Sequence, residues 1–351
     1  MDARHLRRRR HGGHAVVWTD ARWGSQLGGG APIARLCHDL PMPDVRISVG
    51  LPQLLGDDAP DIVQRFAVRA EELGFAGLWT LDSVPGSATS RMRSLEGLHT
   101  LTVAAVVTQA IRLGVAVIVL PERQPGLLAR ELATIDQISG GRLTVGVGVG
   151  RKDPATGSLG FPVERRVLRL REAVEVMRLL WSSDDASYEG ELYRFSGVNV
   201  EPKPLQRPGP PIWFGAGAPP ALRRTARLGD GWMGAGSSSS SAFVDQAKLL
   251  ADALREEGRD PAAFPVGKRV YIAVEDTEEL ARERLTPRLD GFYAAPGITE
   301  RVAVCGSPEA CAEQLRELVA AGAGELLLNP LYDPLEQLEK LARVSELVRA
   351  P

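Results

Sequence analysis

The chain has 351 residues, of which 44% are hydrophobic and 25% charged, and its formal net charge is -2 at pH 7. No apolar run approaches the roughly 18 residues that a membrane-spanning helix needs, so the sequence excludes an integral membrane protein. This composition is typical of a soluble protein, and we expect a cytoplasmic one that binds neither nucleic acid nor a membrane.

The first 43 residues differ from the rest of the chain. They contain the basic run Arg7 to Arg10 and four of the five histidines, and no periodic pattern follows. The apolar stretch after the basic run is too short for a signal peptide, so we expect no export. We interpret residues 1–43 as a disordered leader or a start assigned too far upstream, with nucleic-acid binding by the arginines as the alternative. Residues 44–351 are expected to form one domain.

Cysteine and histidine usage argues against disulfide and metal chemistry. Cys37, Cys305 and Cys311 are an odd number in a long chain, which favours a reducing compartment. His99 is the only histidine beyond the leader, and the cysteines lack a CxxC spacing. We therefore expect no metal site, and we expect Cys305 and Cys311 to be buried thiols.

Helix-like segments that end in glycine and continue into an apolar strand recur along the chain. The clearest unit is residues 114–150, where an apolar run, a helix, a glycine stop and a second apolar run follow one another. The apolar positions at helical spacing in this helix are Leu127, Leu128, Leu132, Ile135 and Ile138. Such junctions are typical of parallel strands covered by helices. The five segments are EELGFAGLWT, AIRLGVAVIVL, ISGGRLTVGV, ARLGDGWMGA and VAAGAGELLLN.

Three further strands at residues 45–51, 210–217 and 268–274 bring the predicted number to eight. Eight strands, most of them followed by a helix, favour a (β/α)8 TIM barrel. A doubly wound open sheet is the alternative, because the pattern does not show whether the first and last strands pair. Between the fourth helix and the fifth strand, residues 187–205 alternate in character and predict a β-hairpin insertion.

Polar residues at the carboxyl ends of the predicted strands are candidates for the site, because barrel enzymes place their catalytic groups there. Each of them has a structural alternative, as a loop cap or a surface ion pair. They are Asp82 and Ser83 after the second strand, Glu122 and Arg123 after the third, Arg151 after the fourth and Asn329 after the last.

Two glycine-rich loops are candidate ligand contacts. Residues 146–157, GVGVGRKDPATG, lack the third glycine and the following helix of a dinucleotide-binding fingerprint, but glycines at a strand end permit a flat ligand to approach the backbone. Residues 215–220, GAGAPP, precede a predicted helix whose amino terminus can attract phosphate, with Arg223 or Arg224 adding charge. A plain tight turn is the alternative for the second loop.

Three separated motifs, AEELGFAGLWTLDS, LPERQPGLLARELATIDQISGGRLTVGVGVG and PPIWFGAGAPPALRRTARLGDGW, together resemble the bacterial luciferase-like flavin monooxygenase family. The resemblance extends from about Val45 to Asn329. It implies a (β/α)8 barrel that binds FMN or the deazaflavin F420 at the carboxyl ends of its strands. It also implies an oxidoreductase that acts on a small organic substrate by hydride transfer or oxygenation, as a homodimer and in some members with a flavin or F420 reductase.

The resemblance also implies roles for particular residues. Asp82 matches an acidic position, and we expect Asp82 and Arg123 to be catalytic. Ser83 stands where many F420-dependent dehydrogenases have a histidine that acts as acid or base, so proton handling would fall to Asp82, another loop or water. Relatives often have a non-prolyl cis peptide at the segment from Val117 to Leu120. The expected cofactor contacts are Ser83, Val117, Ile118, Gly150, Arg151, Gly215, Ala216, Gly217 and Ala218.

The sequence favours one of the two cofactors only through an association between amino-acid composition and the genomes in which F420 is used. Only 5 of the 42 basic residues are lysine, which is typical of GC-rich genomes, where F420 users are frequent. We therefore favour F420 over FMN. The alternatives are an FMN-dependent two-component monooxygenase and, in another class, a non-catalytic protein that only binds the cofactor.

Overall fold

The computed structural model describes residues 45–54, 60–82, 94–150 and 157–350. The predicted leader and two of the expected cofactor contacts, Ser83 and Arg151, lie outside the described residues.

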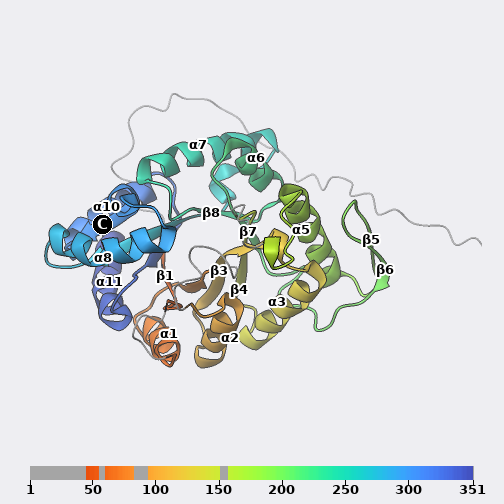
Figure 1. The fold of residues 1–351 in the computed structure, drawn as a ribbon, viewed down its shortest axis with the longest axis horizontal. Helices are drawn as coiled ribbons and strands as arrows, with labels where there is room; N and C mark the ends of the chain where they lie inside the picture. Colours follow the sequence, from red (N-terminus) through yellow and green to blue (C-terminus); the bar gives the residue numbers. More distant parts are fainter. Residues whose placement is uncertain (1–44, 55–59, 83–93, 151–156, 351) are drawn as a thin grey trace, which may run out of the picture. The chain divides into compact units, whose positions relative to one another are not determined.

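Eight parallel strands form a closed barrel, which Figure 1 shows with the strands in the centre and the helices around them. Each strand pairs with two neighbours, and the pairing of the last strand with the first, with Ile47 opposite Leu326, closes the ring. The predicted TIM barrel is confirmed and the open-sheet alternative is wrong. The strands are β1 (Arg46–Gly50), β2 (Gly77–Thr80), β3 (Arg112–Val119), β4 (Leu143–Gly148), β7 (Ile212–Gly215), β8 (Gly231–Gly234), β9 (Val266–Val274) and β11 (Glu325–Asn329).

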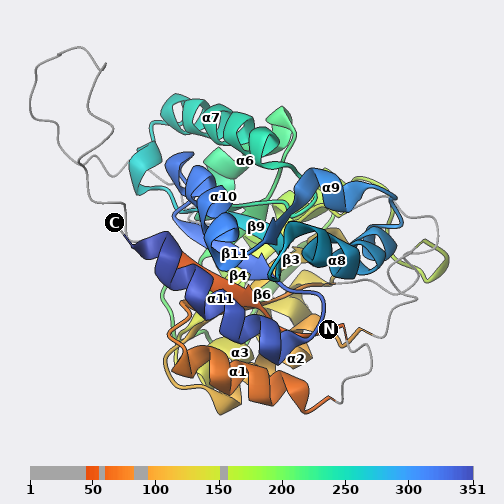
Figure 2. The ribbon, with the colours of Figure 1, turned by 90° about the vertical axis from the view of Figure 1, so that its left-hand side faces the viewer.

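The helices cover the outside of this barrel (Figure 2). In α3, Leu128, Leu132 and Ile135 are buried, whereas Leu127 and Ile138 are exposed at 64% and 46% because they lie at the edges of the apolar face. The helix is capped by Gly140 in the left-handed conformation that the predicted glycine stop requires. The α-helices are α1 (Ile62–Glu72), α2 (Gly97–Val107), α3 (Pro125–Ser139), α5 (Arg166–Ser182), α6 (Pro219–Leu228), α7 (Ser240–Glu256), α8 (Glu278–Tyr293), α9 (Ile298–Val302), α10 (Pro308–Ala320) and α11 (Pro334–Arg349). The 3-10 helices are η2 (Leu120–Glu122) and η3 (Pro261–Ala263).

Three further strands lie outside the barrel ring. The predicted hairpin is present between α5 and β7, as the antiparallel pair β5 (Ala186–Glu189) and β6 (Arg194–Val198). The third, β10 (Ala303–Gly306), was not predicted from the sequence. It pairs in parallel with the second half of β9, because β9 extends beyond its neighbours in the barrel.

Two tryptophans fill the centre of the barrel. The ring centroids of Trp79 on β2 and Trp213 on β7 are 5.8 Å apart, and both side chains are buried. Glycines make room for the indole rings: a Cβ added at Gly114 would lie 2.3 Å from Trp79, and one added at Gly231 would lie 2.5 Å from Trp213. The lumen is therefore packed, and a ligand can enter only at the ends of the strands.

At the amino ends of the strands, Glu325 neutralises two arginines. Its carboxylate accepts hydrogen bonds from Ser48 at 2.8 Å and Trp79 at 3.0 Å, and it lies 3.3 Å from both Arg46 and Arg112. The Glu325 side chain is 1% exposed. This network joins strands β1, β2, β3 and β11 across the barrel. Across the described ranges, none of the helices has the length and hydropathy to cross a membrane.

Candidate active site

The end of β2 is joined to the segment after β3 by an ion pair. Arg123 Nη2 lies 2.6 Å from Asp82 Oδ1 and 3.0 Å from Glu96 Oε1. Burial alone would raise the pKa of Glu96, but hydrogen bonds from His99 and Arg123 lower it overall. The structure thus brings together Asp82 and Arg123, the two residues expected to be catalytic.

Both oxygens of the Asp82 carboxylate are engaged. The second, Oδ2, accepts a hydrogen bond from the backbone N–H of Val119 at 3.0 Å, and the Asp82 side chain is only 2% exposed. Gln53, which the sequence did not single out, binds both the N–H and the carbonyl of Leu81 with its side-chain amide. These contacts fix the positions of the carboxyl ends of β2 and β3, and they favour a positioning role for Asp82 over proton transfer.

Val117 forms a small apolar platform at the carboxyl end of β3. Its side chain is half-buried, and the peptide bond between Ala116 and Val117 is cis, at the start of the segment where the family resemblance places such a bond. A Cβ at Gly148 would lie 2.7 Å from a Val117 methyl group, and one at Gly215 would lie 2.9 Å from the other. The neighbouring glycines therefore make room for Val117, and it is this side chain that a flat ligand would meet.

Two other expected cofactor contacts are Ile118 and Gly150. Neighbouring residues fill the space around the Ile118 side chain and the space that a Cβ would occupy at Gly150. Ile118 is fully buried in the core outside the barrel, backbone included, so it offers no exposed atom to a ligand in this structure. Gly150 has φ +71, and a Cβ there would lie 2.4 Å from Val119 and 2.8 Å from Arg166. Arg166 donates to the Val149 carbonyl at 2.6 Å and forms a buried 2.7 Å ion pair with Glu122, which fixes the end of β4.

The loop from Gly215 to Ala218 leads directly into α6. Pro219 and Pro220 occupy the first two helical positions and have no N–H, and the next two N–H groups donate to the Ala218 carbonyl. The N–H groups of Gly217 and Ala218 have no hydrogen-bond partner among the described residues. The predicted anion cradle is therefore limited to this loop, and the helix itself contributes no free N–H at its first turn.

Two side chains with unpaired polar atoms belong to α6 and the neighbouring α7. The Nε of Arg224 and the Oε1 of Gln246 are buried without a partner, and the Gln246 amide lies 3.1 Å from where a Cβ of Gly217 would be. Burial and the nearby Arg227 lower the pKa of Arg224. The unpaired Nε–H of Arg224 is a donor that suits a negatively charged group, whereas the unpaired Oε1 of Gln246 is an acceptor and suits a donor.

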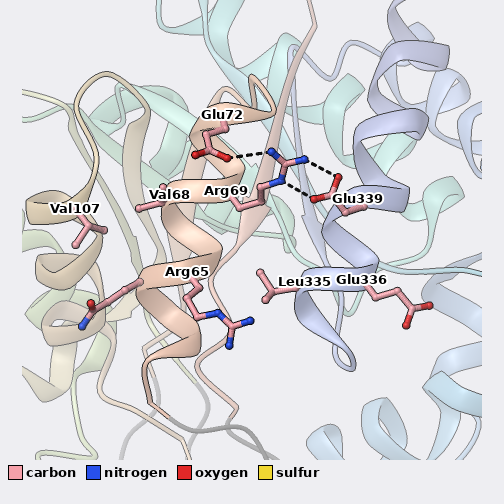
Figure 3. A pocket seen from close by; sticks show the side chains of 9 residues that line it. Arg65, Val68, Arg69, Glu72, Val107, Leu335, Glu336 and Glu339 are labelled. Atoms are coloured by element: carbon pink, nitrogen blue, oxygen red, sulfur yellow. Dashed lines mark hydrogen bonds and ion pairs between the residues drawn. The ribbon is translucent and has the colours of Figure 1, made fainter.

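A separate groove of about 740 Å³ lies on the outside of the barrel between α1 and α11 (Figure 3). Arg69 crosses it and pairs with both Glu72 and Glu339. No strand end contributes to this groove, so we do not assign the active site to it. Its lining is Gln64, Arg65, Val68, Arg69, Glu72, Val107, Leu335, Glu336 and Glu339.

The two cysteines beyond the leader, Cys305 and Cys311, are free and buried. Burial raises the pKa of Cys305 to about 11 and that of Cys311 to about 12, so neither thiol is reactive at neutral pH. Within the described ranges, no group of three His, Cys, Asp or Glu side chains could hold a metal ion.

Comparison with known proteins assigns the family. Residues 44–297 match the luciferase-like monooxygenase family. The chain belongs to this family. A solved structure of an F420-dependent secondary alcohol dehydrogenase with an F420-acetone adduct has the same fold, with a TM-score of 0.75, 21% identity, and coverage of 87% of this chain and 100% of that chain.

Three relatives illustrate the range of the family. An uncharacterized protein of Mycobacterium tuberculosis is 38% identical over 170 residues, which are 48% of this chain and 59% of the relative. The FMNH2-dependent dimethylsulfone monooxygenase of Pseudomonas putida is 33% identical, with coverage of 45% and 43%. The F420-dependent glucose-6-phosphate dehydrogenase of Nocardia farcinica is 28% identical, with coverage of 67% and 78%. The matches to the first two relatives span about half of their length.

Proposed function

We propose that this member of the luciferase-like family is an oxidoreductase that binds F420, or alternatively FMN, at the carboxyl ends of its barrel strands. The observation that carries the proposal is the family match over residues 44–297. The filled lumen supports it, because Trp79 and Trp213 leave the mouth of the barrel as the place for a cofactor. The bound cofactor would supply hydride transfer, or oxygen activation in the FMN alternative.

The described residues fit such a cofactor in two places. The Val117 side chain offers an apolar surface for a planar ring. Gly148 and Gly215 allow this side chain to lie close to the neighbouring strands. The free N–H groups of Gly217 and Ala218, at the start of α6, suit a phosphate group. Gly150 and Ala216 would contribute through their backbones, whereas the fully buried Ile118 would not contact the cofactor directly. The parts proposed for Ser83 and Arg151 rest on the family resemblance alone.

We further propose that Asp82 and Arg123 position the cofactor platform and do not exchange protons with the substrate. Asp82 holds the N–H of Val119, two residues after Val117, and its other oxygen is held by Arg123. A carboxylate with both oxygens engaged and 2% exposure cannot reach a substrate without breaking this pair. A proton required in the reaction would come from another loop or from water.

The experiment that separates the two cofactors is a paired assay on the purified chain. Free reduced FMN consumes oxygen without an enzyme, so the FMN arm measures oxygenated product formed from a substrate panel against a protein-free control. Only a two-component monooxygenase, which would also need a reductase as partner, should form such a product. F420 should bind and give no oxygenated product if the chain is a hydride-transfer enzyme. Oxygenated product with reduced FMN and no binding of F420 would favour the monooxygenase alternative. Tight binding without any turnover on a broad substrate panel would favour the non-catalytic one.

We further propose that the chain forms a homodimer and is located in the cytoplasm. A homodimer is supported by α2, whose outer face exposes Val103 at 36% and Val106 at 64%, next to Val68 of α1 at 39%. Free buried thiols at Cys305 and Cys311 suit a reducing compartment, so we propose a cytoplasmic protein. We propose that residues 44–351 form the single barrel domain. The proposed substrate is a small organic molecule.

A further inference from the structure

Among the residues that the structure describes, Arg269 is an arginine inside the barrel with no acidic partner. Arg269 lies on β9 and reaches across the lumen, and its Nη1 lies 3.4 Å from the carbonyl oxygen of Ala116 on β3. Its Nη2 donates to the Tyr271 hydroxyl at 2.5 Å, and its Nε is buried without a partner among those residues. The residue as a whole is half-buried, so part of it remains exposed while the Nε is withdrawn from water.

Arg269 differs in this respect from the other arginines along the lumen and its mouth. Arg46 and Arg112 share the carboxylate of Glu325, and Arg123 pairs with Asp82. Among the residues that the structure describes, no carboxylate forms an ion pair with Arg269. A guanidinium withdrawn from water without a counter-ion is unfavourable, so a site that keeps one is suited to bind an anion.

The guanidinium is held in a defined orientation. It lies over the Tyr271 ring, 4.9 Å from the centroid, and the Tyr271 hydroxyl is 3.0 Å from that of Tyr293 on α8. Burial raises the pKa of Tyr271 well above 10, so the phenol keeps its hydrogen; it accepts from Arg269 and can donate to Tyr293. Gly236 packs against both the Tyr271 ring and the Arg269 stem. Because the Arg269 guanidinium is already fixed, ligand binding would lose less side-chain conformational entropy.

We propose that Arg269 binds a carboxylate of the substrate, so that the small organic substrate of this enzyme is an acid. This inference rests on the proposed function and specifies its substrate class. The long contact of Nη1–H with the Ala116 carbonyl leaves this donor for a carboxylate oxygen, and the negative charge would also compensate the buried, unpaired Nε–H. A guanidinium binds carboxylate oxygens more strongly than neutral ones. The proposal involves binding and orientation only, with no proton moved by Arg269.

The test compares acids with their neutral amides. The full chain, with and without its bound cofactor, is titrated calorimetrically with benzoate and benzamide and with acetate and acetamide. We expect at least one acid to bind about tenfold or more tightly than its amide. The variant Arg269→Gln should abolish this preference and Arg269→Lys should retain part of it. Arg259→Gln is the matched control, because Arg259 is also half-buried and bonded to carbonyl oxygens, outside the lumen.

The outcomes separate this inference from the proposed function. If the cofactor binds and neither acid is preferred in the wild-type chain, the inference is overturned and the proposed function stands; this comparison needs no variant to fold. If Arg269→Gln shifts the reduction potential of the bound cofactor and leaves the acid preference unchanged, the charge acts on the cofactor and the inference is also overturned. Failure of the chain to bind either cofactor would count against the proposed function alone.

Discussion

Arg123 and Asp82 form a 2.6 Å hydrogen-bonded ion pair between the segment after β3 and the end of β2. The same carboxylate holds the N–H of Val119, so one side chain fixes the strand that carries the Val117 platform. Under the proposed function, the two residues that the sequence suggests as catalytic would act on the proposed cofactor site through the backbone of β3.

Replacing Asp82 by asparagine tests this positioning role. Asp82→Asn removes a charged partner from a pair in which Asp82 is 2% exposed, and we expect the free energy of unfolding in urea to fall by about 1.5 to 3 kcal/mol. Cofactor affinity should fall with it. Asp252→Asn, in an exposed pair with Arg255, should leave stability nearly unchanged. Unchanged stability and affinity in Asp82→Asn, with turnover lost, would instead indicate an acid-base role.

The carboxylate at the amino ends of the strands should matter more for stability. In Glu325→Gln the partly exposed guanidinium groups of Arg46 and Arg112 lose their buried counter-ion. The buried donors of Ser48 and Trp79 also lose a charged acceptor. We expect a loss of about 3 kcal/mol in the free energy of unfolding. Urea unfolding of Glu339→Gln, whose carboxylate pairs with Arg69 on the surface, provides the control and should show little change. Equal effects of the two substitutions would contradict the role given to Glu325.

The fit between Val117 and its neighbouring glycines predicts a compensating pair of substitutions. Gly148→Ala places a methyl group 2.7 Å from Val117 and should destabilise the fold by about 1 to 3 kcal/mol. Adding Val117→Ala should recover part of that loss in thermal unfolding. Gly291→Ala in α8, where a Cβ meets nothing within 4 Å, should stabilise by about 0.5 to 1 kcal/mol. Absence of recovery in the double variant would show that Val117 does not occupy this space.

Lys268 makes stability depend on pH. Burial and the neighbouring Arg269 lower its pKa from 10.5 to about 7, while its ammonium group donates to the carbonyls of Ala235 and Ser238. Between these two values folding releases a proton, because the unfolded chain binds it and the folded one does not. The free energy of unfolding should therefore rise with pH over this window.

The measurement for Lys268 is urea unfolding at a series of pH values from about 7 to 10. Lys268→Met should have a smaller pH slope than the wild-type chain, and Lys248→Met, at an exposed position in α7, should keep the wild-type slope. Parallel curves for the wild-type chain and Lys268→Met would show that Lys268 is still charged in the folded state.

The strands of the barrel could be predicted because their signals are local. The apolar run, the glycine stop at Gly140 and the next run lie within a few residues of one another, and the same holds for the hairpin around Glu189. The sequence does not predict strand β10, because its segment AVCG is short and pairs only with the extension of β9.

The contacts inside the site could not be predicted, because they join residues far apart in the chain. Arg269 and Ala116 are 153 positions apart, and nothing near either residue indicates the other. The glycines of β4 were interpreted as space for a ligand, whereas Gly148 makes room for Val117 of the neighbouring strand. Arg269 did leave a signal: two adjacent cations in KRVYIAV, an otherwise apolar strand, indicate charges with a particular use.

Cofactor affinity tests the central claim most directly. The purified full chain is titrated with F420 and with FMN, following the fluorescence of each cofactor, and Val117→Arg, which puts a charged side chain on the platform, is titrated beside it. We predict a dissociation constant in the micromolar range or below for one of the two cofactors, with F420 favoured, and loss of that affinity in the folded Val117→Arg variant. Binding of neither cofactor, or equal binding by the variant, would contradict a cofactor site at the mouth of the barrel.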